Sequence, residues 1–216
     1  MPEPKPRSSS RRRRVTPETL VEAGIELTLP KVTVKALAEK LGVSIVAIYN
    51  NIDCIDTLRT LVAEEILQRW QFPMPGDHDT LQEALLHLSV ELRALVHGNP
   101  GIARYLLDLD ADSPRALNRI DAVDQRYAQL FELNPMQARW AVTTVSEHAI
   151  ALAELIHTPD RRSEDGQAIL ARTDLTLIPL TVDGKERDSD TSFEWSMRAV
   201  IMGTAVVVGH PRFATY

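Results

Sequence analysis

Four consecutive arginines, Arg11, Arg12, Arg13 and Arg14, stand directly before the first predicted helix. Guanidinium groups bind phosphate well, so this run indicates a polyanionic partner. Residues 1–14 carry six basic side chains and one acidic one, in a chain whose formal net charge is -6. Because this Pro-, Ser- and Arg-rich segment is too polar to pack, we expect a disordered basic arm that binds nucleic acid. A solvated tail or a nuclear localisation signal is the alternative interpretation.

A second group of residues has the chemistry to contact the bases and phosphates of duplex DNA. A short helix beginning at Ser44 presents mostly apolar side chains, which suit thymine methyl groups. Asn50 is suited to pair with adenine, and Thr33, at the start of the preceding helix, is placed to bind phosphate. The full set of candidate DNA-binding residues after the arm is Thr33, Ser44, Ile45, Val46, Ala47, Tyr49, Asn50 and Asn51.

Helix start and stop signals predict the elements that position these residues. Thr16-Pro17 begins a helix that runs to about Thr28. Thr33 caps a second helix, VKALAEKL, and Gly42 ends it. Ser44 then caps the short third helix. A helix, a tight turn with glycine and a second helix form the helix-turn-helix signature.

The rest of the chain keeps the helical pattern. Helices are predicted from Asp53 or Asp56 to Phe72, Asp79 to His97, Asn99-Pro100 to Leu109, Ser113-Pro114 to Leu133, Asn134-Pro135 to His157, and Thr191 to Val208. Residues 158–191 read as a polar loop, and only 175–182 has a strand-like pattern. We therefore predict an all-α fold with a basic arm (1–14), a helix-turn-helix domain (15–55), a linking helix and turn (56–76), and a larger helical domain (77–216).

The run from Thr33 to Ile52 resembles the DNA-binding segment of the tetracycline-repressor (TetR) family of bacterial transcription regulators. The matching positions are Thr33, Leu37-Ala38, Leu41-Gly42-Val43-Ser44 and Tyr49. The resemblance implies that residues 77–216 bind an effector and dimerise. It also implies that the Tyr49 hydroxyl contacts phosphate or sugar, although the ring could instead serve as a core wedge.

Three positions depart from the family pattern: Ala47 replaces a threonine, Asp53 replaces a basic residue, and Asn51 stands where the tetracycline repressor often has histidine. Residues 15–72 also contain five basic and eight acidic side chains. The helices alone are therefore poorly equipped to neutralise phosphate, and we expect the arginine arm to supply that attraction.

Polar and aromatic side chains within apolar helices are candidates for a ligand pocket. Trp140, Thr144 and His148 share one helix face, and His87 is a further candidate. The resemblance places Gln71 and Tyr105 at effector-contacting positions, where the tetracycline repressor has histidines and one of them binds magnesium. This chain has neither histidine, so a tetracycline–magnesium effector is not expected. For each candidate, a surface or satisfied core role is the alternative.

The sequence contains no motif for catalysis: the glycine-rich phosphate loop, GxSxG and HExxH are missing, and the histidines are scattered. We expect no enzyme activity, cofactor or metal. Cys54 is the single cysteine, expected to be buried, and fits a reducing cytoplasm. No apolar run approaches the length needed to span a bilayer.

These observations predict a homodimeric, ligand-responsive repressor that binds a palindromic operator. The segment AVIMGTAVVVG, residues 199–209, is apolar nearly all round, so we expect the dimer to form through the helices at 135–157 and 192–208. A central core helix of a monomer is the alternative for this segment. The alternative function is an all-α interaction module whose helix-turn-helix is only structural.

Overall fold

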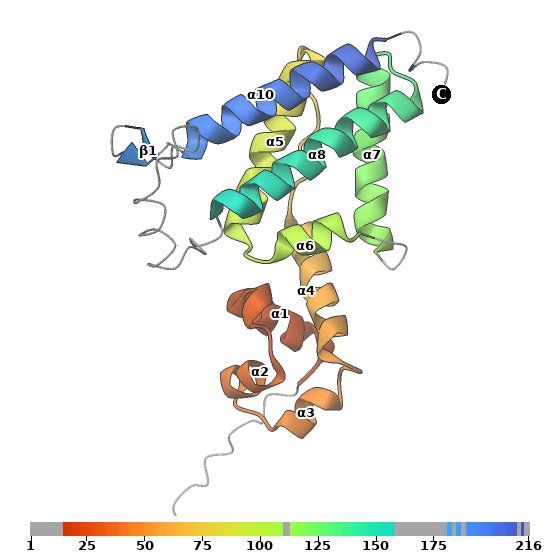
Figure 1. Cartoon of the computed structure of the whole chain (residues 1–216). Helices are drawn as coiled ribbons and strands as arrows, with labels where there is room; N and C mark the ends of the chain where they lie inside the picture. The colour runs from red at the N-terminus through yellow and green to blue at the C-terminus, as the bar shows by residue number, and fades with distance from the viewer. Residues whose placement is uncertain are drawn as a thin grey trace, which may run out of the picture. The chain divides into compact units, whose positions relative to one another are not determined.

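The computed structural model describes residues 15–109, 113–157, 181–182, 185–186, 189–210 and 213. They belong to two compact units, Met1–Ile66 and Leu67–Tyr216. The predicted all-α fold is confirmed, since the strands within the described residues are only two residues long (Figure 1). The arginine run and most of the predicted loop at 158–191 lie outside the described residues.

The first unit begins with three helices whose starts follow the predicted caps. They are α1 (Pro17–Leu27), α2 (Val34–Leu41) and α3 (Ile45–Tyr49), with a short 3₁₀ helix, η1 (Leu29–Lys31), after α1. Thr16 and Thr19 form a reciprocal capping box, and Pro17 occupies the first turn, where its missing N–H costs nothing. The next helix, α4 (Ile55–Arg69), runs past the division between the units, so that residues 67–69 belong to the second.

The turn between α2 and α3 depends on Gly42. Its φ of 66° and ψ of 37° lie in the left-handed region, where glycine avoids the steric cost of a side chain. The Val43 amide then donates to the Ala38 carbonyl at 3.0 Å, which closes the end of α2. This turn sets the direction in which α3 leaves α2.

The core of the first unit draws buried side chains from each of its helices. Leu20, Leu37, Ile48, Leu58 and Val62 are all fully buried. A close approach between α1 and α4 adds to this packing, because a Cβ added at Gly24 would lie 2.5 Å from Cγ2 of Val62. Only glycine at position 24 allows the two helices this contact.

The second unit is a helical bundle. It comprises α5 (Leu81–Gly98), α6 (Ile102–Leu107), α7 (Pro114–Leu130), α8 (Pro135–His157) and α10 (Ser189–Val208). The central helix α8 packs against α5, α6, α7 and α10, and α10 also packs on α5. A two-residue antiparallel pair, β1 (Thr181–Val182) with β2 (Lys185–Glu186), precedes α10.

Several element boundaries differ from the predictions. The last helix begins at Ser189, so Thr191 lies inside α10 and is not its cap. α4 ends at Arg69, before Phe72, and α7 ends at Leu130, before Leu133. These differences arise at helix ends, where the last turn is decided by tertiary contacts more than by local signals.

We expect Gly24→Ala to lower the free energy of unfolding by about 1–3 kcal/mol, because the added methyl group must displace Val62 from a filled core. Gly98→Ala is the matched control, since a Cβ there meets nothing within 4 Å and alanine suits a helix better than glycine. Urea denaturation followed by circular dichroism measures both. Equal stability of the two variants would contradict the tight α1–α4 contact.

Candidate nucleic-acid interface and ligand cavity

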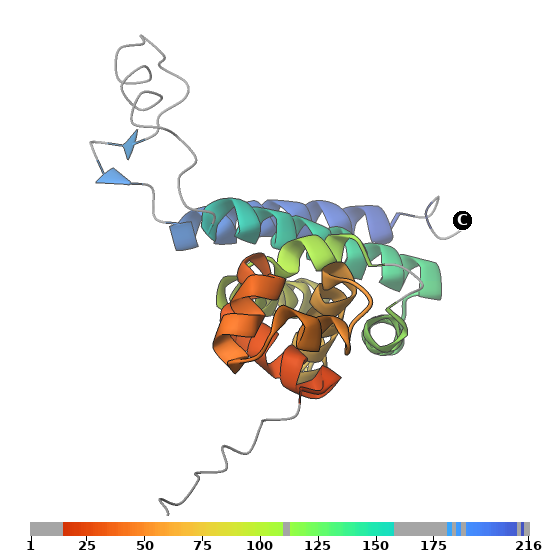
Figure 2. The same ribbon diagram turned by 90° about the horizontal axis from the view of Figure 1, so that it is seen from below.

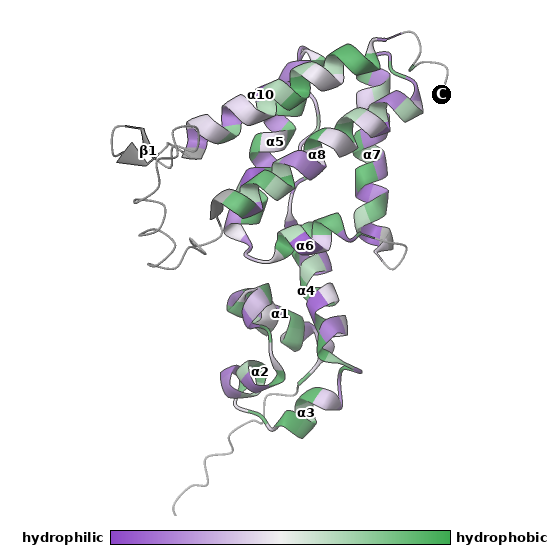
Figure 3. Ribbon diagram, viewed as in Figure 1, coloured by the Kyte–Doolittle hydropathy of each residue, from purple (hydrophilic) through white to green (hydrophobic). Residues whose placement is uncertain are grey.

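Helix α3 displays most of its side chains to solvent. Ile48 alone is fully buried, whereas Val46 is 66% exposed, Tyr49 54% and Ile45 50%. Figure 3 shows that the helix is mostly apolar along its length. An exposed apolar helix of five residues is poorly suited to water and well suited to a partner surface.

The polar residues around α3 divide into engaged and available groups. The Ser44 Oγ accepts from the Ala47 amide at 3.2 Å, and the Thr33 Oγ1 accepts from the Ala36 amide at 3.1 Å. Each hydroxyl still has its own hydrogen to donate. Asn50 is exposed, whereas Asn51 is partly buried and donates from Nδ2 to the Ala47 carbonyl at 2.9 Å.

The wedge that holds α3 in the core is Ile48. Tyr49, for which a wedge role was the alternative, is 54% exposed, which favours the outward role. Ala47 lies half-buried between the exposed and buried sides of the helix. The residues that reach outward from this turn are therefore Ile45, Val46, Tyr49 and Asn50.

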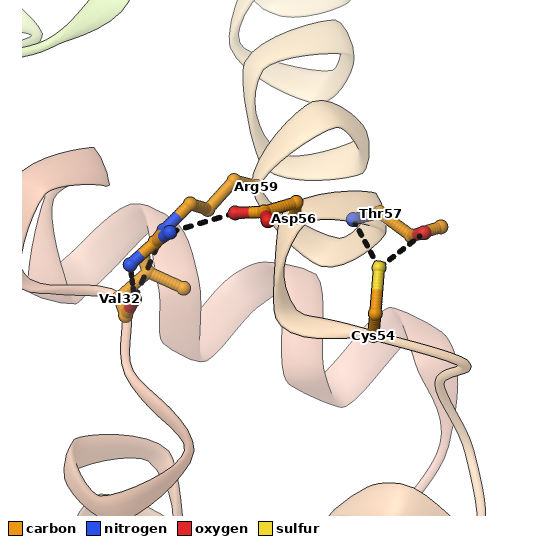
Figure 4. A network of polar contacts seen from close by, with 5 residues as sticks. All are labelled: Val32, Cys54, Asp56, Thr57 and Arg59. Atoms are coloured by element: carbon orange, nitrogen blue, oxygen red, sulfur yellow. Dashed lines mark hydrogen bonds and ion pairs between the residues drawn. The ribbon is translucent and has the colours of Figure 1, made fainter.

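An arginine on α4 fixes the backbone that leads into α2 (Figure 4). Arg59 donates from Nε and Nη2 to the Val32 carbonyl, at 3.2 and 2.9 Å, and from Nη1 to the Asp56 carboxylate at 2.8 Å. Val32 directly precedes Thr33, so this contact helps to position the Thr33 cap. Asp56 and Arg59 look like an ordinary surface pair in the sequence, and only the fold brings the guanidinium to Val32.

The prediction that Cys54 is buried is wrong, because the residue is exposed. Its Sγ lies 3.1 Å from the Thr57 Oγ1 and accepts from the Thr57 amide at 3.4 Å (Figure 4). The hydrogen bond with the Thr57 side chain, and then that from its backbone, lowers the pKa of the thiol. Cys54 thus occupies a helix-start position that normally favours Ser, Thr, Asp or Asn, and this position keeps it at the surface.

A hollow of about 400 Å³ lies on the first unit between α1 and the end of α2. Glu18, Glu22 and Glu26 line it along one face of α1, together with Lys40, which pairs with Glu26 at 2.5 Å. Carboxylates repel the DNA backbone, so this face of α1 is unsuited to contact it.

The second unit contains a mostly apolar cavity of about 200 Å³. Trp70 and Phe72, whose ring centroids lie 4.6 Å apart, form its aromatic wall. The polar residues of the lining all come from α8. The full lining is Trp70, Phe72, Leu88, Leu92, Leu106, Leu107, Leu109, Leu117, Ile120, Val123, Arg139, Val142, Thr143, Ser146, Glu147 and Ile150.

None of the six predicted ligand residues lines this cavity. Gln71 and His148 are exposed, and Thr144 is half-buried. The exposed His87 lies 3.8 Å from Glu91, the Tyr105 hydroxyl is 2.8 Å from Ser113 Oγ, and the Trp140 ring packs 4.9 Å from Phe213.

The lining of the cavity uses a different face of α8 from the predicted one. Arg139, Thr143 and Glu147 line the cavity, and each precedes one of the predicted residues Trp140, Thr144 and His148. One residue corresponds to a rotation of about 100° around the helix. Because α8 carries apolar residues on several sides, its sequence alone does not fix which face points inward.

A buried carboxylate holds one of the cavity residues. The Asp124 Oδ2 lies 3.2 Å from the Arg139 Nη1, and the side chain of Asp124 is 8% exposed. Its Oδ1 has no hydrogen-bond partner among the described residues. Burial raises the pKa of Asp124, and the charge of Arg139 opposes this effect.

Within the described residues, no cluster of three or more His, Cys, Asp or Glu side chains could hold a metal ion. The same part of the chain has no helix that is both long and apolar enough to cross a bilayer.

The raised pKa of Asp124 predicts a pH-dependent stability. The folded protein binds this proton more readily than the unfolded chain, so stability falls as the pH rises from the unfolded pKa through the raised one. We expect the wild type to gain melting temperature relative to Asp124→Asn as the pH is lowered through that range. Asp108→Asn, which removes an exposed carboxylate of the same unit that does not influence the pKa of Asp124, is the control. A melting-temperature difference that does not change with pH would contradict the effect of burial.

No protein-family model matches the sequence, and no curated protein matches it. Solved structures do. ActR from Streptomyces coelicolor, a TetR family protein in complex with (S)-DNPA, has a TM-score of 0.67 and 19% identity, over 90% of this chain and 99% of that one. TetR-Q116A from Acinetobacter baumannii AYE, in complex with minocycline, has a TM-score of 0.61 and 19% identity, over 89% and 98%. SCO7222, a TetR transcriptional regulator from Streptomyces coelicolor, has a TM-score of 0.58 and 17% identity, over 90% and 99%. The chain therefore has the fold of the TetR-family regulators.

Proposed function

We propose that the protein is a DNA-binding transcription regulator that responds to a small molecule. The observation that carries this proposal is α3, a five-residue helix that is capped at its start, is anchored by the buried Ile48 and displays Ile45, Val46 and Tyr49 to solvent. A recognition helix needs this arrangement, because its side chains must reach base edges while the helix stays fixed in its domain. The similarity to regulators in fold supports the same assignment.

Base recognition in this proposal is largely apolar. Ile45, Val46 and Ala47 suit thymine methyl groups, and the exposed Asn50 amide suits adenine. The free hydroxyl hydrogens of Thr33, Ser44 and Tyr49 serve phosphate contacts. Asn51 contributes less than Asn50, because its amide is already bonded to the Ala47 carbonyl.

The arginine arm supplies the electrostatic part of DNA affinity. No cation stands on α3, and Asp53 just after it is exposed and acidic. Arg11 to Arg14 stand only a few residues before α1 in the chain. Arginines on such an arm bind the phosphate backbone or enter the minor groove beside the recognition helix.

The protein acts as a homodimer in this proposal. α8 and α10 lie side by side (Figure 2), and both display large apolar side chains. Val206 is 73% exposed, and the other exposed apolar residues on these helices are Met136, Leu155, Trp195, Met202 and Val207. Pairing two such helices from each chain would bury these side chains in a symmetric contact. Two-fold symmetry then favours a palindromic operator.

The cavity in the second unit is the proposed effector site. Its apolar body and its polar edge on α8 suit a small ring compound with polar groups along one side. ActR has been solved with actinorhodin and the A. baumannii TetR variant with minocycline, which supports ligand binding by this fold. Effector binding would release the operator, as in a repressor that works in the cytoplasm.

Deleting residues 1–14 tests the DNA-binding role of the arm. We expect wild-type protein to retard duplex DNA at low salt, and the deletion to flatten the slope of log K against log salt by up to about 3 to 4, because up to four phosphate contacts are lost. Deletion of residues 1–10, which leaves all four arginines, is the control. An unchanged slope would exclude the arm from binding. Wild-type protein that never retards DNA would favour the alternative of a structural helix-turn-helix.

Val206→Arg tests the dimer. The substitution places a charge in the proposed apolar contact, so we expect the mass measured by light scattering to fall from twice 24.2 kDa to 24.2 kDa, with loss of tight DNA binding. Gln129→Arg adds the same charge to an exposed position of α7 and should leave the dimer intact. A wild-type mass of 24.2 kDa at micromolar concentration would refute both the dimer and the palindrome.

A further inference from the structure

One arginine of α7 donates hydrogen bonds to the backbone carbonyl groups at the end of α4. The Arg119 Nη1 lies 2.7 Å from the Leu67 carbonyl oxygen, 2.9 Å from that of Gln68 and 3.2 Å from that of Trp70. The last carbonyls of a helix have no partner within the helix, and the negative end of its dipole attracts a cation. Arg119 therefore caps the carbonyl end of α4, which ends at Arg69.

The same guanidinium group also lies over the wall of the cavity. The Arg119 Cζ is 5.2 Å from the centroid of the Phe72 ring, within the range of a cation–π contact. Phe72 and Trp70 form the aromatic wall, and Ile120, the neighbour of Arg119 on α7, lines the cavity as well. A single side chain thus contacts both the end of α4 and an aromatic residue that an occupant of the cavity would touch.

We propose that Arg119 couples the state of the cavity wall to the end of α4, and so to DNA binding. This inference rests on the proposed function. An occupant that shifts Phe72 disturbs the ring under the guanidinium, and the planar guanidinium cannot keep both its stacking and its three carbonyl contacts if the ring moves. The last turn of α4 then loses its cap and frays.

The other end of α4 explains why fraying would matter for DNA. Within the first unit, Arg59 of the same helix holds the Val32 carbonyl, which directly precedes Thr33. An arginine thus donates to backbone carbonyls near each end of α4. Arg59, on α4, donates to the Val32 carbonyl, and Arg119, on α7, donates to carbonyls at the end of α4. Loss of the Arg119 contact changes how firmly α4 supports the segment that leads into the helix-turn-helix.

Arg115 provides a matched control on the same face of α7. It lies one turn before Arg119 and is exposed, and among the described residues its hydrogen bond goes to the Gln68 side chain, from Nη1 to Oε1 at 3.1 Å. Arg115→Ala removes the same charge as Arg119→Ala without touching the carbonyls of α4. A difference in hydrogen exchange or DNA binding between these two variants therefore results from loss of the cap on α4 and not from the change in net charge.

A double-mutant cycle on Phe72 and Arg119 tests the coupling in the full-length protein. Amide hydrogen exchange of a peptide covering residues 61–72 should accelerate about tenfold in Arg119→Ala, because three bonds from a charged donor are lost. Phe72→Leu should accelerate this exchange several-fold. The double variant should exchange no faster than Arg119→Ala alone, because both substitutions break the same contact. Arg119→Lys, which keeps the charge but not the planar fork, should restore part of the protection, and Arg115→Ala should match the wild type.

The outcomes separate the coupling from the proposed function. Multiplicative effects of the two substitutions, or equal exchange in Arg119→Ala and Arg115→Ala, would overturn the coupling. If the exchange rates show the expected coupling, Arg119→Ala should also weaken binding to a duplex that the wild type retards, by several-fold relative to Arg115→Ala. Unchanged DNA binding in Arg119→Ala would overturn the link between this contact and DNA. Wild-type protein that binds no DNA would refute the proposed function, while the exchange cycle would still decide whether Arg119 joins the cavity wall to α4.

Discussion

Each helix leaves backbone N–H and carbonyl groups unpaired at its ends, and the architecture of this protein depends on the side chains that pair them. Local caps pair the starts: Thr16, Thr33, Ser44 and Thr80 each accept a bond from an amide of their own helix. The end of α4 is paired from a distance, by Arg119 of α7. Local caps fix where helices begin, whereas the distant cap makes the end of one helix depend on the packing of another.

The first unit separates shape from charge. Helix α3 and the residue after it offer apolar side chains and the exposed Asn50 amide, whereas the charge of the unit is unfavourable for phosphate, with Asp53 beside α3 and three glutamates along α1. In the proposed regulator the cations belong to the arginine run, which precedes α1 in the sequence. Electrostatic attraction is sensitive to salt and insensitive to sequence, while apolar base contacts have the opposite properties. The arm and the helix would thus contribute affinity and specificity separately.

The cavity has a comparable division between an apolar body and one polar edge. Arg139, at that edge, is held by a carboxylate that is itself buried and has one oxygen unpaired among the described residues. Such an arrangement costs stability at neutral pH, because the charged form of Asp124 is poorly solvated. Charged groups that are expensive to bury fix the direction of their partners, and here the partner faces the proposed effector site.

The sequence by itself determined the fold class, the positions of the helix starts and the helix-turn-helix, because these depend on neighbouring residues: Thr16 with Pro17, Thr33 with its own helix, Gly42 with the turn it allows. It also indicated that α3 is apolar.

Prediction from the sequence failed where a residue's position depends on contacts with distant parts of the chain. Cys54 was expected inside because of its residue type, whereas its place at the start of α4 exposes it. The face of α8 that lines the cavity was missed by one residue, since a helix with apolar residues on several sides can turn any of them inward. The contacts of Arg59 with Val32 and of Arg119 with α4 join residues 27 to 52 positions apart, and only tertiary packing brings such residues together.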